Sequence, residues 1–355
     1  MYRDIATHVL KRAADDGAAY QLPGWAFGII LLDLIVFLPF ILVVGYTFNN
    51  VFPVIAMIED PSPPAYEPVS LNADTDSLAE DIAPVADESA RGGQDTRAIS
   101  SSFRSLHRTL TGISGWKSYF RGLVCWMALT VATLFVYAIV SALPFVPAIV
   151  AAMISAVALI QLYCAWLHTV ISAPSPKRFY QRLPPFKKAF QACALPTVLY
   201  FVALEIRSWL PRFLARAMGM TVWDSQNPGQ VPQPNGSDSW KGLIVLIVSI
   251  AITIFVTIPA HVVLTRTQAS LLPEEDETIV PFDRSFQGKL EPAIVGGRGY
   301  VTIKDAWQTF SRASWVRLVK LYVKIFLVSL VVYLGFALVM IPEAFLIARN
   351  TEKAQ

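Results

Sequence analysis

A short proline-rich run in the first quarter of the chain has the residue types of a peptide ligand. Pro63, Pro64 and Tyr66 fit the pattern Pro-Pro-x-Tyr, which WW domains bind. Prolines favour the extended polyproline II conformation before binding, so they enter an aromatic-lined groove at low entropic cost while the tyrosine ring fills a neighbouring pocket. The pattern predicts a binding site for a WW-domain ubiquitin ligase of the HECT type. The alternative is a stiff tether that holds the segment away from a membrane.

Polar side chains inside long apolar runs form a second group of candidates. Asp33 lies eight residues into the first run, about 12 Å along an α-helix, whereas Glu205 and Arg207 lie within about one turn of the end of a later run. A charge placed in hydrocarbon is costly and is a functional hypothesis by default. We predict that Asp33 is structural and pairs with a neighbour such as Arg207. A protonated carboxyl group and a polar transport pathway are the alternatives.

The sequence contains no pattern of enzyme chemistry. It lacks CxxC, HExxH, GxSxG, a P-loop and GxGxxG, and the glycine-rich run at 296–299 lacks the strand and helix context that a phosphate-binding loop needs. The acidic run at 274–277 has neither the turn glycine nor the ligand spacing of a calcium site, so we expect a solvated loop there. The sequence therefore predicts no enzymatic activity, no cofactor and no metal site.

The elements that must position these residues follow from the composition. The chain is 54% hydrophobic and only 15% charged, with a mean hydropathy of +0.49, whereas an ordinary soluble domain is about 25% charged. The apolar residues gather in six runs, each long enough for a helix to cross about 30 Å of hydrocarbon. Since only helices satisfy the backbone in such runs, we predict an all-α polytopic transmembrane bundle of about six spans. The predicted spans are 25–48, 122–143, 145–170, 189–210, 243–264 and 325–342.

The segments that connect the spans differ in character. Two of them, 100–121 and 303–324, carry apolar residues at helical spacing with basic residues between them, which predicts amphipathic helices on the membrane surface. The first connection, 49–99, contains the proline-rich run and ten acidic residues with few large apolar ones, which predicts disorder. The remaining segments are the tails 1–24 and 343–355 and the loops 171–188, 211–242 and 265–302.

The distribution of Lys and Arg predicts the orientation of the chain, because these residues favour the cytosolic side. Six crossings place both termini and the 211–242 connection on one side with nine basic residues, and the other connections on the opposite side with twenty. We therefore predict large cytosolic loops and luminal or extracellular termini, in the endomembrane system or the plasma membrane. Asn235 begins an N-glycosylation sequon on the predicted luminal side, unless this tripeptide is there by chance. The basic residues border the spans, which is not the pattern of a nucleic-acid-binding protein.

Two polar runs that follow predicted spans carry a family resemblance. One is Pro-Pro-Ala-Tyr-Glu-Pro at 63–68, and the other, at 269–284, begins Ala-Ser-Leu-Leu-Pro-Glu-Glu-Asp-Glu. Together they resemble a group of fungal multi-pass membrane proteins, some of which are named ubiquitin carrier protein. The resemblance extends over most of the chain and implies a multi-pass fold. It does not imply ubiquitin conjugation, because that activity needs a His-Pro-Asn motif and no histidine of this chain is followed by proline.

Two functions remain open from the sequence. The first is a membrane-embedded interaction protein, an adaptor or client that recruits a WW-domain ubiquitin ligase from the cytosol. The second is a transporter or channel-like protein that uses Asp33 and other polar residues inside the membrane. The lipid bilayer is the expected surrounding in both.

Overall fold

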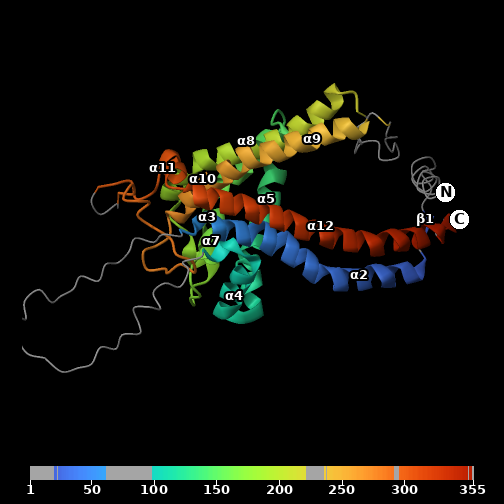
Figure 1. Cartoon of the computed structure of the whole chain (residues 1–355), viewed down its shortest axis with the longest axis horizontal. Helices are drawn as coiled ribbons and strands as arrows, with labels where there is room; N and C mark the ends of the chain where they lie inside the picture. Colours follow the sequence, from blue (N-terminus) through green and yellow to red (C-terminus); the bar gives the residue numbers. More distant parts are fainter. Residues whose placement is uncertain are drawn as a thin grey trace, which may run out of the picture.

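The computed structural model describes residues 20–21, 23–60, 98–220, 236, 238–291, 296–350 and 352–353. This part of the chain is almost entirely helical (Figure 1). Five of its helical stretches are long and apolar enough to cross a bilayer, and a bent pair of helices makes a sixth. The prediction of an all-α, multi-pass membrane protein is therefore confirmed, with five spans, or six when the bent pair is counted as one span.

The first half of the chain contributes three spans. The first span consists of α2 (Gly24–Leu42), the π-helical segment η1 (Val43–Val51) and α3 (Phe52–Ile58). The second span is α5 (Leu123–Ser141), which follows three shorter helices, η2 (Ile99–Ser101), α4 (Phe103–Ser114) and η3 (Gly115–Phe120). The third is the bent pair α6 (Ala148–Ala158) and α7 (Ile160–Ile171).

The second half contributes the other three spans. The short helix η4 (Phe179–Arg182) precedes the fourth span, α8 (Phe186–Ala217). The fifth consists of α9 (Asp238–Ile252), the π-helical segment η5 (Thr253–Thr257) and α10 (Ile258–Ala269). The sixth is α12 (Arg312–Arg349), which follows α11 (Ile303–Gln308). The strands β1 (Tyr20–Gln21) and β2 (Glu352–Lys353) pair antiparallel, so the start of α2 and the end of α12 lie at the same end of the molecule (Figure 1).

The first span is longer than the sequence predicted. Its helix continues to Ile58, so the prediction of a disordered connection at 49–99 is wrong for 49–58, whereas 61–97 lie outside the described residues. Hydropathy placed the end at 48 because polar Asn49 and Asn50 interrupt the apolar run. The helix passes this point because every residue of α3 is buried against other helices.

Two further boundaries differ from the prediction. The predicted amphipathic helix at 303–324 is divided between α11 and the start of α12, because Ser311 caps a new helix by accepting a hydrogen bond from the Ser314 amide. α12 then continues through the predicted span into the predicted tail, as far as Arg349. The third span, predicted as one run at 145–170, bends by 57° at Leu159. Neither glycine nor proline lies at this bend, so the sequence carried no signal for it.

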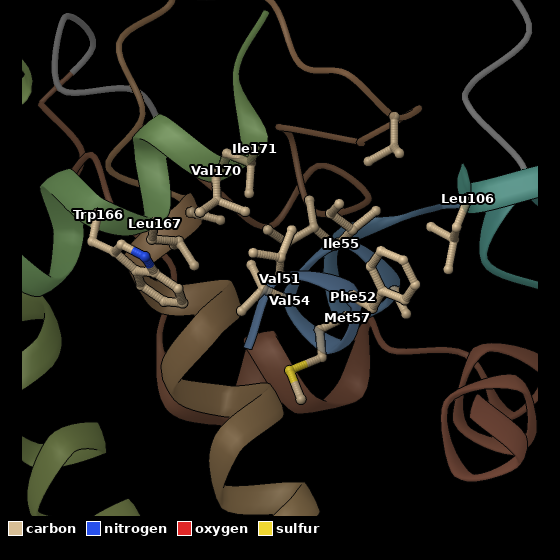
Figure 2. Packing of buried hydrophobic residues seen from close by; sticks show 14 of the residues in the cluster. Val51, Phe52, Val54, Ile55, Met57, Leu106, Trp166, Leu167, Val170 and Ile171 are labelled. Atoms are coloured by element: carbon tan, nitrogen blue, oxygen red, sulfur yellow. The ribbon is translucent and has the colours of Figure 1, made fainter. Parts of the chain in front are cut away.

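The packed core lies at the end of the bundle where α3, α7 and α10 gather (Figure 1), and Figure 2 shows how its side chains pack. α3 is at its centre, where Phe52, Ile55 and Met57 are at most 1% exposed. α3 packs against α7, α10 and α12, and Leu106 of α4 belongs to the same cluster. Side chains buried in this way make many van der Waals contacts, so this end carries the part of the fold that protein contacts stabilise.

Away from the core, the spans expose their apolar side chains. In Figure 1, α2 runs beside α12 and α8 runs beside α9. Leu31 of α2, Phe135 of α5, Phe255 of η5 and Leu338 of α12 are between 58% and 78% exposed. Lipid tails solvate such surfaces as well as protein does, so these side chains form the surface that faces the bilayer.

A buried arginine joins three helices within the core. Arg266 of α10 is 5% exposed, and its guanidinium donates to the carbonyl oxygens of Ala306 at 3.0 Å and Met57 at 3.3 Å. It also lies over the rings of Phe286 and Phe310, 5.0 and 5.5 Å from their centroids. The charge is therefore compensated by carbonyl dipoles and ring faces, which hold α10 against α3 and α11.

The acidic run at 274–277 is only partly solvated, which corrects the expectation from the sequence. Asp276 is 7% exposed and lies 3.8 Å from Arg182 and 3.2 Å from Lys177, both in the preceding basic loop. The hydrogen bond and charge of Asp276 raise the pKa of Lys177. Backbone bonds from Ala173 to Glu277 and from Ile279 to Ile171 complete the contact between the two loops.

Candidate functional site

A polar cavity of about 450 Å³ lies where the spans converge. Its lining comes from η1, α5, α7, α8, α10 with the adjoining η5, and α12, so each of the six spans contributes to it. The volume is within the range of small-molecule sites, about 300–1,000 Å³. In the described part of the chain, this is the cavity to which all the spans contribute lining residues.

Aromatic side chains form much of the cavity wall. The ring of Tyr200 on α8 stacks on the imidazole of His261 on α10, with centroids 4.7 Å apart and planes 19° from parallel. The His261 Nδ1 lies 3.4 Å from the hydroxyl of Tyr322 on α12. Trp126 and Tyr163 add further rings to the lining. These rings come from separate spans, so the cavity keeps its shape only when the spans are assembled.

The cavity has a positive charge and no negative one. Arg207 of α8 is the only Lys, Arg, Asp or Glu side chain in the lining. Within the described part of the chain it takes part in none of the ion pairs. Glu205 is half-buried but lies two residues away on the same helix, a spacing at which side chains do not face each other. The guanidinium therefore sets the electrostatic character of the cavity.

Two of the contributing spans contain π-helical segments beside prolines. Pro53 lies two residues after the end of η1, and Pro259 lies two residues after the end of η5. Proline removes a backbone donor and crowds the preceding turn, and a wider π turn accommodates both effects without a sharp kink. In η1 the side-chain amides of Asn49 and Asn50 donate to the carbonyl oxygens of Val44 and Gly45, at 2.8 and 2.9 Å. Single π turns are frequent at functional sites, and both of these segments line the cavity.

The predicted partner of Asp33 is wrong. Asp33 shares a side-chain hydrogen bond with Glu343 of α12, and not with Arg207, which lines the cavity. Sequence reasoning missed Glu343 because the predicted last span ended one residue before it. The remaining predicted site residues, Pro63, Pro64, Tyr66 and Asn235, lie outside the described residues.

A second polar cluster holds together the two ends of the segment 61–97. The carboxylate of Glu59 accepts hydrogen bonds from the amide of Ile99, from the amide of Ser100 at 2.9 Å and from the Ser100 hydroxyl. Arg317 of α12 lies 3.8 Å from the same carboxylate. Glu59 is 2% exposed, so these contacts compensate a buried charge. We call this cluster the Glu59 clamp.

The chain was compared with protein families, curated proteins and solved structures. Nothing in these three comparisons matches it.

Proposed function

We propose that the protein is a membrane carrier that binds a small solute in the cavity between its spans. The observation that carries this proposal is the convergence of all six spans on one polar cavity. Polar groups inside a membrane are costly to bury and are retained where they line substrate pathways. Transporter sites are also formed by spans whose helices are interrupted. Here the first and fifth spans contain π-helical segments, and the third span is bent.

The test compares ligand binding to two tryptophan variants of α8. Leu204 lines the cavity, so Leu204→Trp is expected to fill it and to abolish binding. Leu195 on the same helix is 60% exposed, so Leu195→Trp is the matched control and should bind like the wild type. The measurement is the unfolding temperature of the purified protein with small anions, cations and neutral aromatic compounds. A bound ligand at a hundred times its Kd stabilises the protein by about 2.7 kcal/mol.

The outcomes of this test separate the proposal from its alternatives. A compound that stabilises the wild type and Leu195→Trp, but not Leu204→Trp, supports a cavity ligand. Uptake of that compound into proteoliposomes then distinguishes a carrier from a receptor. If no compound stabilises the wild type, or if Leu204→Trp responds equally, the cavity is not a binding site.

We propose recruitment of a WW-domain ubiquitin ligase as a second function, because one observation favours it. The Glu59 clamp fixes the chain four residues before Pro63, at the end of the bundle where the basic loops lie. If this end is cytosolic, as the distribution of Lys and Arg predicts, the motif would be presented to soluble partners next to the membrane. The same orientation would place Asn235 in the lumen or outside the cell, where it would be open to glycosylation.

A peptide of residues 58–70 is expected to bind WW domains with a Kd in the micromolar range, about −8 kcal/mol. Tyr66→Ala should abolish this binding because the ring fills the specificity pocket, whereas Ser62→Ala should have little effect. Titration against a panel of WW domains measures both, and the turnover of the full chain with and without Tyr66→Ala extends the test to cells. Equal binding of both variant peptides, with unchanged turnover, would leave the proline run as a tether. Sealed microsomes enclose the lumen and expose the cytosolic face, so protease added from outside should cleave the 61–97 segment if the predicted orientation is right. Protection of this segment would oppose the orientation.

A further inference from the structure

Several polar groups of the cavity wall already have partners inside the protein. The Trp166 Nε1–H donates to the hydroxyl of Tyr46 at 3.1 Å, and the backbone carbonyl oxygen of Gln268 accepts from the His168 Nε2–H, behind the wall, at 3.0 Å. The amides of Asn49 and Asn50 are bound to carbonyl oxygens of η1. These groups hold the wall together and do not point to a ligand.

Two other groups of the lining have no such partner in the described part of the chain. Thr257 is 6% exposed, and its buried hydroxyl has no hydrogen-bond partner. The guanidinium of Arg207 forms neither an ion pair nor a hydrogen bond there. A guanidinium has only donors, and a hydroxyl donates as well as accepts. The buried hydroxyl is costly to leave without a partner, whereas Arg207 is exposed and offers its donors to a ligand from the cavity lining.

The remaining surface of the cavity suits an apolar, planar group. The stacked rings of Tyr200 and His261 come from two spans, and Trp126 and Tyr322 add rings from two others. Aromatic faces pack well against another ring in an offset or edge-to-face arrangement. The lining thus combines one cation, one buried and unsatisfied hydroxyl, and several ring faces, without an acidic side chain.

We propose that the ligand of this cavity is a small organic anion with a planar apolar body. Its carboxylate or phosphate group accepts hydrogen bonds from Arg207 and from the Thr257 hydroxyl, and its planar body packs among the aromatic rings. This inference rests on the proposed function, that the cavity binds a solute, and adds the chemical class of that solute. Arginine is suited to the role because its planar fork donates two parallel hydrogen bonds to either anion.

The probes are aromatic compounds of similar size that differ in charge. Benzoate and phenyl phosphate carry the two anionic groups, benzamide is neutral, benzylamine is a cation, and acetate is an anion without a ring. Binding to the full chain is measured in nanodiscs of phosphatidylcholine, which has no net charge. We expect benzoate or phenyl phosphate to bind at least about tenfold more tightly than benzamide, benzylamine and acetate. Loss of benzoate binding in nanodiscs that contain anionic phosphatidylglycerol would identify a lipid headgroup as the anion that occupies the cavity in place of a free solute.

Variants of the two polar groups complete the experiment. Arg207→Gln should weaken binding of the anion at least about tenfold, and Thr257→Val should weaken it about fivefold because it removes only a hydroxyl. Arg207→Lys keeps the charge and should lose less than Arg207→Gln. Arg212→Gln is the matched control on α8, since Arg212 is exposed and does not line the cavity.

The two proposals fail in different ways. If benzamide or benzylamine binds best and Leu204→Trp abolishes that binding, the cavity binds a solute but the anion inference is overturned. It is also overturned if anion binding is equal in the wild type, Arg207→Gln and Arg207→Lys. If no probe binds the wild type and no other compound of the stabilisation panel does, the proposed function itself fails.

Discussion

Replacing Arg266 with alanine is expected to lower the free energy of unfolding by about 3–5 kcal/mol, enough to prevent accumulation of the folded protein. The change leaves the buried carbonyl oxygens of Met57 and Ala306 without their donor. It also empties the space between the rings of Phe286 and Phe310. Arg266→Lys is expected to recover only part of this loss, because one ammonium group cannot reach the same partners in the same plane.

The measurement is a denaturant titration of the purified protein in detergent, together with the yield from membranes. Arg298→Ala is the control, because Arg298 is an exposed arginine in the connection that follows α10. Its substitution should change the free energy of unfolding by no more than about 0.5 kcal/mol. Equal stability of the Arg266 and Arg298 variants would mean that the buried guanidinium does not hold α10 in place.

Removal of the Glu59 carboxylate is expected to have an effect of similar size. Glu59→Ala leaves the partly buried Arg317 without its counter-ion and the amides of Ile99 and Ser100 without their acceptor. Breaking a buried pair in this way typically costs about 3–5 kcal/mol. Because the clamp joins α3, η2 and α12, the loss should be greatest around η2. Hydrogen exchange of the Ile99 and Ser100 amides is therefore expected to accelerate more than exchange within α5.

Two further variants make this prediction specific. Glu275 is an acidic residue of which 84% of the side chain is exposed, and its contact with Lys177 is a surface pair. Glu275→Ala should therefore cost at most about 1 kcal/mol. Glu59→Gln keeps an acceptor oxygen and should lie between the wild type and Glu59→Ala. Unchanged exchange at Ile99 and Ser100 in Glu59→Ala would show that the clamp does not order η2.

The spans were predictable from the sequence because their physical cause is local. A helix that crosses hydrocarbon needs a long apolar run, and composition alone reveals such a run. The same criterion failed at α3, because Asn49 and Asn50 interrupt the apolar run just before this helix. It failed again at Glu343, where an acidic residue reads as the end of a span although α12 continues for six more residues.

The cavity was harder to predict than the spans. Arg207 stands out in an apolar run, and the sequence marks it as a candidate. The contacts of His261 with Tyr200 and Tyr322 depend on which faces of α8, α10 and α12 meet, and no local pattern determines this. The pairing of Asp33 was mispredicted for the same reason, since α2 lies beside α12 and its acid meets Glu343.

The Glu59 clamp also has a consequence for the way in which the protein is made. Arg317 reaches back to Glu59 across 258 positions of the chain. When the first span has entered the bilayer, α12 has not yet been synthesised, so α3 lacks one of the helices that bury it. The early spans can insert into the bilayer during translation, but the core around α3 can pack fully only after α12 has been synthesised. Until then, the insertion machinery or a chaperone has to shield α3 and the unpaired carboxylate of Glu59.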